Sequence, residues 1–240
     1  MSAVLYAAAD GVATLTLNRP ERRNALNLEM CELLSNFSLE LSSSQDVKLV
    51  LVKANGPVFC AGADLKEREG MSAEQVRERR MKGFAAYAAL EALPMPAVAV
   101  VEGPAIGSGC EIAGACDFIV ATPAASFRTP EATRGTVGAT QRLPRILGKR
   151  LAKDLMFTGR TLSAEEARDA GLVSRLISSS ELPAELQKIT KTILEAPQQS
   201  LRLAKRCIDC GVERDAKGAL EEEIAAIEEQ LAAGSWMGRK

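Results

Sequence analysis

Ala97-Val-Ala-Val-Val101-Glu-Gly103-Pro-Ala-Ile-Gly-Ser-Gly-Cys-Glu111 is the stretch that decides the fold of this chain. It begins with an unbroken apolar run, which is typical of a strand buried on both faces of a sheet. The glycine-rich loop 103–111 follows and leads into a short predicted helix at residues 110–115. Such a loop presents free backbone N–H groups to an anion or to a polarised carbonyl. The stretch therefore predicts a strand, a ligand-binding loop and a helix in direct succession.

Further strands and helices are predicted on both sides of this unit. Residues 12–17, 47–52 and 118–121 are apolar or alternating runs of strand length. Residues 28–41 have apolar side chains at helical spacing, and the capping-box sequence Ser72-Ala-Glu-Gln75 begins a helix that extends to about residue 93. The order of these elements indicates an α/β domain with short connections.

After Gln141 the sequence changes to one predicted helix after another. A second capping-box sequence, Ser163-Ala-Glu-Glu166, begins one of them, and prolines and a glycine separate the later ones. This half of the chain predicts a helical extension of the α/β domain. We place the α/β core at residues 1–180 and the C-terminal helical region at residues 181–240.

The composition excludes several classes of function. Thirty Lys and Arg against 31 Asp and Glu leave a formal net charge of -1, whereas a protein that binds polyanions needs a basic excess. Aromatic residues make up only 4%, too few to stack on single-stranded nucleic acid. The sequence contains no His, which excludes Ser-His-Asp catalysis, Cys-His catalysis and His-ligated metal. Acid–base chemistry near neutral pH is then left to Asp, Glu, Lys, Cys and Tyr.

The six cysteines are predicted to be reduced thiols that are mostly buried. No basic segment followed by a long apolar run precedes them, so we expect no secretory signal, no membrane span and a cytoplasmic location. Cys207-Ile-Asp-Cys210 has the C-x-x-C spacing, but it lies in a predicted helix and lacks a second pair or a His to complete a zinc site. We interpret it as two ordinary helical thiols.

Three more stretches place small residues and acids where neither a core nor a surface requires them. Phe59-Cys-Ala-Gly-Ala-Asp-Leu-Lys66 follows a buried strand, and its small side chains let a ligand approach the backbone. Phe127-Arg-Thr-Pro-Glu131 presents a carboxylate after a proline, and Thr140-Gln-Arg-Leu-Pro-Arg145 leads into the helical half. Taken alone, Glu111 and Glu131 each have a structural interpretation as an acid in the first turn of a helix.

In this order, the stretches resemble the enoyl-CoA hydratase/isomerase family, also called the crotonase superfamily. The resemblance extends from residue 11 to about residue 223. Within the family, residues 59–72 look most like the methylglutaconyl-CoA hydratase branch. The motifs that carry the resemblance are Leu17-Asn-Arg-Pro20, Asn24-Ala-Leu26, Phe59-Cys-Ala-Gly-Ala-Asp-Leu-Lys66, Gly107-Ser-Gly-Cys-Glu111, Ala115-Cys-Asp117, Pro130-Glu131, Thr140-Gln-Arg-Leu143 and Ala167-Arg-Asp-Ala-Gly-Leu-Val173.

The resemblance implies an α/β fold, a crotonase-like spiral of β-β-α units with a helical C-terminal trimerisation region. It implies a lyase of the enoyl-CoA hydratase type, which adds water across the α,β-double bond of an acyl-CoA thioester in fatty acid metabolism. The expected partner is the thioester substrate, and the expected assembly is a homotrimer or hexamer. No metal, nucleic acid or membrane partner is implied, and no separate cofactor, because coenzyme A is part of the substrate.

The resemblance also implies which residues form the site. The backbone N–H groups of Ala63 and Ser108 would form an oxyanion hole that stabilises the enolate. Glu111 would activate the water and Glu131 would donate a proton to the α-carbon, although the pair would titrate as a unit. Lys66 would lie near the phosphates, and the adenine pocket would begin at residues 23–25. The implied substrate- and CoA-binding positions are Arg23, Ala25, Ala61, Ala63, Asp64, Leu65, Lys66 and Ser108.

The chain departs from the family pattern in two places. Only Gly138-Ala139 stands before Thr140, where the family has a longer Pro-Gly-rich loop that helps to hold the catalytic water. Residues 232–240 replace a further helix and tail that normally cover the acyl pocket or pack between subunits.

These departures leave other functions open. One alternative is an enoyl-CoA isomerase, a dehalogenase or another crotonase-type activity, and a second is a catalytically silent binder of CoA thioesters. Some methylglutaconyl-type relatives bind RNA through a Lys-rich first helix. The corresponding helix here, residues 28–41, contains neither Lys nor Arg, which excludes RNA binding by that route.

Overall fold

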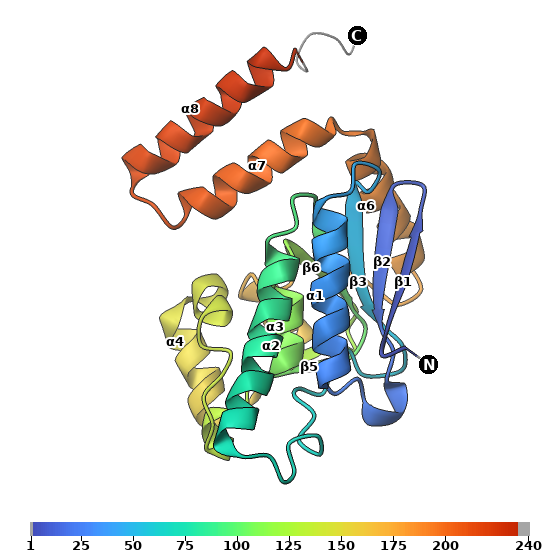
Figure 1. The fold of residues 1–240 in the computed structure, drawn as a ribbon, viewed down its shortest axis with the longest axis vertical. Helices are drawn as coiled ribbons and strands as arrows, with labels where there is room; N and C mark the ends of the chain where they lie inside the picture. Colours follow the sequence, from blue (N-terminus) through green and yellow to red (C-terminus); the bar gives the residue numbers. More distant parts are fainter. Residues whose placement is uncertain (1, 235–240) are drawn as a thin grey trace.

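The computed structural model describes residues 2–234 and contains strands and short connections followed by helices (Figure 1). The strands are β1 Val4–Ala9, β2 Val12–Leu17, β3 Leu49–Ala54, β4 Ala97–Val101, β5 Pro104–Ile106, β6 Phe118–Ala121, β7 Ser126–Arg128, β8 Thr161–Ser163 and β9 Arg175–Leu176. The α-helices are α1 Leu28–Ser42, α2 Ala73–Glu91, α3 Ser108–Gly114, α4 Arg142–Thr158, α5 Ala164–Asp169, α6 Leu182–Glu195, α7 Gln198–Gly211 and α8 Ala216–Ala232. Two 3₁₀ turns are η1 Pro20–Arg22 and η2 Ala132–Arg134.

The strands form two sheets. The larger has the order β1-β2-β3-β4-β6-β9 and is parallel except for the β1–β2 hairpin, and the smaller has the order β5-β7-β8. The strands predicted at 12–17, 97–101 and 118–121 are confirmed. The strand predicted at 47–52 instead begins at Leu49, because pairing with β2 starts there, opposite Val12.

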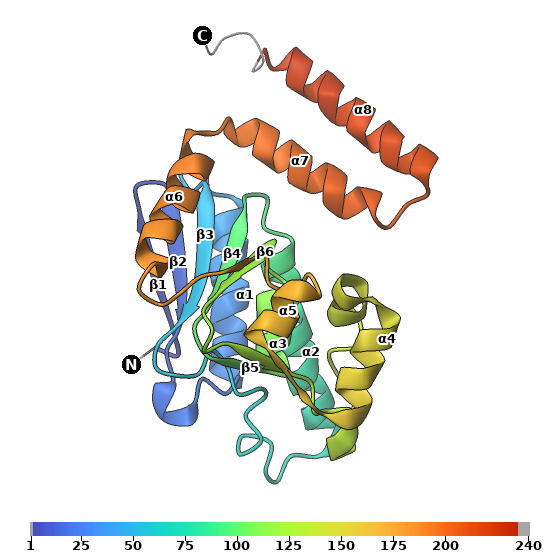
Figure 2. The same ribbon diagram turned by 180° about the vertical axis from the view of Figure 1, so that it is seen from behind.

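Helices cover both faces of the larger sheet, as the apolar run of β4 predicts. Helices α1 and α2 lie side by side over one face (Figure 1). Helix α6 lies over the other face (Figure 2). Its Leu182, Leu186 and Ile189 pack against strands β3, β4 and β6. All five residues of β4 are therefore buried. The predicted boundary between residues 1–180 and 181–240 falls just before α6.

Side-chain caps fix the starts of several helices. Ser72 and Gln75 cap α2 reciprocally, and Ser163 and Glu166 do the same for α5, which confirms both capping boxes. The Asn27 side chain accepts a hydrogen bond from the Met30 N–H at the start of α1. These contacts occupy backbone donors that a helix start leaves without partners.

Helices α7 and α8 pack on each other and stand at one end of the molecule, beyond the sheet (Figures 1 and 2). Among residues 2–234, no helix has both the length and the apolar content needed to cross a bilayer. Residues 232–240, where the sequence departs from the family pattern, lie mostly outside the described residues.

Candidate active site

Backbone hydrogen bonds hold the loop that carries Ala63 on both of its sides. The Cys60 N–H donates to the Pro104 carbonyl at 3.2 Å, and the Ile106 N–H donates to the Cys60 carbonyl at 2.8 Å. Two residues further on, Gly62 O accepts from the Leu26 N–H at 2.8 Å. The loop is therefore clamped between β5 and the segment before α1, two elements that its own sequence does not reveal.

These hydrogen bonds orient the Ala63 N–H group toward the space beside α3. In a trans peptide, the C=O of one residue and the N–H of the next point in opposite directions. Since Gly62 O faces Leu26, the Ala63 N–H points the other way. The same geometry applies at α3, where Gly107 O accepts from the Glu111 N–H and the Ser108 N–H points out of the helix start. Neither N–H donates to an acceptor within the described chain.

Both N–H groups face a single cavity of about 300 Å³. It lies between loop 61–65, helix α2, the start of α3 and residues 130–139. Glu111 and Glu131 both line it, and Tyr87 and Phe84 of α2 form an apolar part of its wall. The structure thus brings the two predicted acids and the two predicted N–H donors to one cleft.

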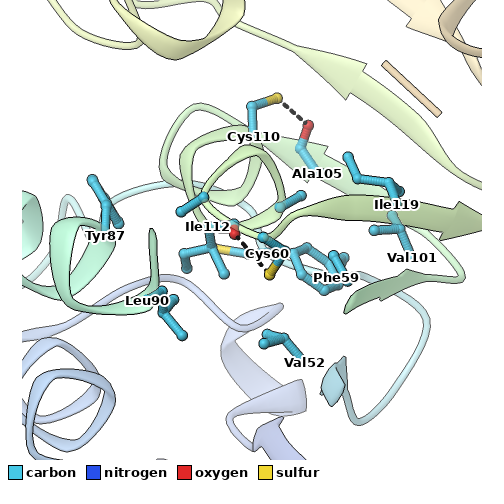
Figure 3. Packing of buried hydrophobic residues seen from close by; sticks show 14 of the residues in the cluster. Val52, Phe59, Cys60, Tyr87, Leu90, Val101, Ala105, Cys110, Ile112 and Ile119 are labelled. Carbon is cyan, nitrogen blue, oxygen red and sulfur yellow. Dashed lines mark hydrogen bonds between the residues drawn. The ribbon is translucent and has the colours of Figure 1, made fainter. Parts of the chain in front are cut away.

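Cysteines next to this cleft are structural. Burial raises the pKa of Cys60 to about 12, and its thiol lies against the carbonyl of Gly62. Cys110 is also fully buried, and its thiol donates to the Ala105 carbonyl at 3.1 Å (Figure 3). A buried thiol with a raised pKa is a poor nucleophile. Cys31 and Cys116 are buried too, which confirms that most of the cysteines are core residues.

Glu111 lies in the first turn of α3, and an ion pair fixes its carboxylate. Its Oε2 accepts from Arg142 Nη1 at 2.7 Å, and the side chain is only 8% exposed. Burial raises the pKa of Glu111 above its usual range, and the Arg142 guanidinium opposes that rise. Arg142 stands in the Thr140-Gln-Arg-Leu143 motif, but nothing in the sequence links it to Glu111.

Glu131 follows Pro130 and has a different environment. Its Oε2 is buried and has no hydrogen-bond partner in the described structure. Burial raises the pKa of Glu131, and the charge of Glu111 raises it further. A Cβ added at Gly107 would lie 2.2 Å from Glu131 Oε1, so the carboxylate occupies the space that this glycine leaves. Glu131 therefore lacks the charged hydrogen-bond partner that Glu111 has in Arg142.

The shortened loop packs directly on Glu131. A Cβ built on Gly138 would lie 3.1 Å from Glu131 Cγ. Arg80 of α2 holds the same loop, because it donates to Thr136 Oγ1 at 3.2 Å and to the Val137 carbonyl. The loop therefore forms one wall of the cleft, and Arg80 is a functional candidate that the sequence did not single out.

The predicted CoA-binding positions divide into two groups. Ala61, Ala63, Leu65 and Ser108 line the cavity, whereas the remaining four predicted positions are not among the cavity-lining residues in the described part of the chain. One of these, Asp64, pairs with Arg19 at 3.0 Å. The other three are Arg23, Ala25 and Lys66.

The Asp64 carboxylate holds the loop. It accepts from the N–H groups of Lys66 and Glu67 as well as from Arg19. Burial alone would raise the pKa of Asp64, but these donors hold it below its usual value. The Arg23 carbonyl accepts from the Ala61 N–H at 3.0 Å, so the backbone at residue 23 supports the same loop.

An α/β fold that brings two backbone N–H donors and two acids to one cleft is typical of one class of enzyme. Comparisons with known proteins identify the family. The family model described as enoyl-CoA hydratase/isomerase matches residues 7–235. The chain belongs to the enoyl-CoA hydratase/isomerase family. The α/β crotonase-type fold with C-terminal helices, expected from the sequence, is therefore confirmed.

Individual relatives agree over most of their length. The chain is 38% identical over 215 residues to "Probable enoyl-CoA hydratase echA8" of Mycobacterium leprae, covering 88% of this chain and 83% of the relative. It is 35% identical to the crotonyl-CoA hydratase of Syntrophomonas wolfei, covering 90% of this chain and 85% of that protein. The crystal structure of an enoyl-CoA hydratase from Bacillus anthracis superposes with a TM-score of 0.90 at 35% identity, covering 94% of this chain and 90% of that one.

Proposed function

We propose that this chain adds water across the α,β-double bond of an enoyl-CoA thioester. The observation that carries the proposal is the convergence of Glu111 and Glu131 on a cavity whose wall offers the free N–H groups of Ala63 and Ser108. Two acids suit a reaction that removes one proton from water and delivers another to carbon. Two backbone donors suit a carbonyl oxygen that becomes negatively charged during the reaction.

The proposed reaction balances without any redox partner. Glu111 accepts a proton from water as the water oxygen bonds to the β-carbon, and the electrons of the double bond move toward the thioester carbonyl. The resulting enolate oxygen is stabilised by the N–H groups of Ala63 and Ser108. Glu131 then gives its proton to the α-carbon and restores the thioester. The proton that Glu111 took from water is then transferred to Glu131. Both acids regain their starting protonation, so each turnover adds one water.

We propose that the CoA moiety extends from this cavity along loop 61–66, with its phosphates near the exposed Lys66 and its adenine near residues 23–25. The support is that Ala61, Ala63 and Leu65 already line the cavity and that the exposed Lys66 follows them in the chain.

A spectrophotometric assay with crotonyl-CoA and several branched and carboxylated enoyl-CoAs tests the proposal. Loss of the absorbance of the conjugated thioester supports hydration, and chromatography identifies the 3-hydroxyacyl product. An isomerase is the second candidate, because the loop at Gly138-Ala139 packs on Glu131, at the place where the family resemblance implies a longer loop that helps to hold the catalytic water. Conversion of 3-enoyl-CoA without hydration would favour that alternative, and binding without any turnover would indicate a silent CoA-thioester binder.

We propose further that the acyl group carries a second carboxylate, as in the methylglutaconyl-CoA hydratase branch. Arg68 lines the cavity, its Nε is buried without a hydrogen-bond partner, and it has no acidic partner among the ion pairs of the described residues. Burial lowers the pKa of Arg68, and the cations Arg79 and Arg80 lower it further. A carboxylate on the acyl chain would compensate this charge.

Arg68→Met is therefore expected to lower kcat/KM for a carboxylated enoyl-CoA by about tenfold or more, since a hydrogen bond to a charged group contributes about 1.5–3 kcal/mol. Turnover of crotonyl-CoA should change little. The matched control is Arg77→Met, which removes an exposed arginine of α2 outside the cavity. Equal losses for both substrates in Arg68→Met would indicate that Arg68 serves the CoA phosphates, and the carboxylate proposal would be wrong.

We propose a homotrimer or hexamer, because the paired helices α7 and α8 leave many apolar side chains exposed. Ile208, Val212 and Leu220 are 65%, 76% and 56% exposed, and a surface this apolar is typical of a contact face. Light scattering at micromolar concentration should give three or six times the mass of the chain. A monomer under those conditions would contradict the proposal.

A further inference from the structure

We propose that Arg142 is a positioning residue that favours the ionised form of Glu111 and fixes its orientation, and so makes it the proton acceptor of the two acids. The inference rests on the proposed hydratase function and assigns a role to a residue that does not line the cavity. It is carried by an asymmetry between the two acids: Glu111 has a cationic partner at hydrogen-bond distance, and Glu131 has none.

The guanidinium of Arg142 is fixed from three sides. It donates to Glu111 at 2.7 Å, and it forms a two-point contact with Glu91, whose two oxygens lie 3.1 Å and 2.5 Å from Arg142 Nε and Nη2. It also lies over the ring of Tyr87, 5.8 Å from the centroid. Arg142 is the first residue of α4 and its side chain is only 16% exposed. A bidentate pair of this kind restricts orientation as well as charge.

The orientation leaves one oxygen of Glu111 for chemistry. Arg142 takes Oε2, whereas Oε1 makes no hydrogen bond within residues 2–234. Because Glu111 lines the cavity, Oε1 can accept a proton from a water there. Glu91 is half exposed and sits on the far side of the guanidinium, so it anchors Arg142 without reaching the cavity.

The charges around Glu111 support its role as the proton acceptor and that of Glu131 as the proton donor. Its titratable neighbours are Arg142 of α4, Glu91 and Tyr87 of α2, Cys110 of its own helix, and Glu131. Arg142 is the cation of this set, and it offsets both Glu91 and Glu111. Around Glu131, the nearby cations Arg80 and Arg134 make no ion pair with it, and Arg80 is engaged by the loop at residues 136–137.

Removing the charge of Arg142 should shift the pH dependence of kcat/KM to higher pH. Arg142 favours ionised Glu111, so its loss raises the pKa of Glu111. The acidic limb of the kcat/KM profile reports the group that must be ionised, and it should therefore move to higher pH in Arg142→Gln. An opposite charge at this distance lowers a carboxyl pKa by about 1–3 units, so the expected movement is at least about one pH unit.

Two further variants separate charge from position. Arg142→Lys keeps the charge but cannot contact Glu91 and Glu111 with a planar fork, so kcat should fall while the acidic limb moves little. Arg145→Gln is the matched control, because it removes an exposed arginine one turn further along α4 that pairs with Glu213 and not with the acids of the cleft. It should leave the profile unchanged.

The test uses the full chain, with hydration rates measured across pH and the Glu111 carboxyl titrated by ¹³C NMR. The Glu111→Gln variant assigns the resonance, and this titration needs no turnover. A Glu111 titration that moves to higher pH in Arg142→Gln and stays near its original position in Arg142→Lys supports the inference. If the pKa of Glu111 in Arg142→Gln equals that of the unaltered protein, the inference is wrong. If Arg142→Gln does not fold, the Arg142→Lys variant decides: a Glu111 pKa displaced in that variant, which keeps the charge, also overturns the inference. Absence of hydration by the unaltered protein, with the titration shift intact, would instead refute the proposed function.

Discussion

Glu131→Gln and Glu111→Gln are each expected to lower the turnover of an enoyl-CoA by about 10²–10⁴-fold, the usual range for a general acid or base. Glutamine keeps the shape of each side chain but can neither accept nor deliver the proton that hydration moves. Thioester affinity should hardly change, because the oxyanion donors are backbone N–H groups that neither substitution removes. Steady-state rates and a binding titration with a saturated acyl-CoA measure the two effects separately.

The double variant should lose much less than the product of the two single losses, because residues that act as a unit are not additive. Glu102→Gln is the matched control, since Glu102 is an exposed acid in the β4–β5 connection, outside the cavity. If Glu111→Gln costs only a few-fold, the reaction needs a single proton carrier, and the isomerase alternative takes first place.

The sequence predicts the long elements of this fold because each of them has its own periodicity. The alternation of β2 and the all-apolar run of β4 can be recognised without any partner strand. Strands β5, β7, β8 and β9 have only two or three residues, and too few side chains alternate in them to give a pattern. Those short strands matter functionally, because β5 is one of the two elements that clamp the loop of Ala63.

The sequence predicts the residues of the candidate site but not the contacts between their side chains. Small residues in loop 59–66 and acids at 111 and 131 indicated a site and, through the family resemblance, its chemistry. Arg142 was visible in a motif, yet its contact with Glu111 depends on how the start of α4 meets α3. Similarly, the family resemblance implies that Asp64 contacts CoA, but it does not reveal that the Asp64 carboxylate accepts from Arg19 and two backbone N–H groups. Such pairings follow from tertiary packing, which a local sequence pattern does not contain.

The close approach of α3 to loop 59–66 sets the spacing of the two oxyanion donors. A Cβ added at Gly109 would lie 2.5 Å from the Cys60 carbonyl oxygen and 3.0 Å from Cys60 Cβ. Both obstacles belong to a residue whose backbone N–H and C=O are already bonded to β5. The added methyl group therefore cannot be accommodated by turning one flexible side chain. Either α3 or the loop must move, and each movement would separate Ser108 from Ala63.

Gly109→Ala should consequently impair both stability and catalysis. Overpacking of a tight contact costs about 1–3 kcal/mol of unfolding free energy, and misplacement by about 1 Å can cost 10²-fold in rate. Gly114→Ala is the matched control at the other end of α3, where the new Cβ would meet its nearest neighbour, Ile146 Cδ1, at 3.7 Å. That variant should fold and turn over like the original protein. Denaturant unfolding measures the loss of stability, and kcat and the affinity for a saturated acyl-CoA measure the loss of function. Full activity in a folded Gly109→Ala protein would mean that the N–H groups of Ala63 and Ser108 do not act together on the thioester carbonyl.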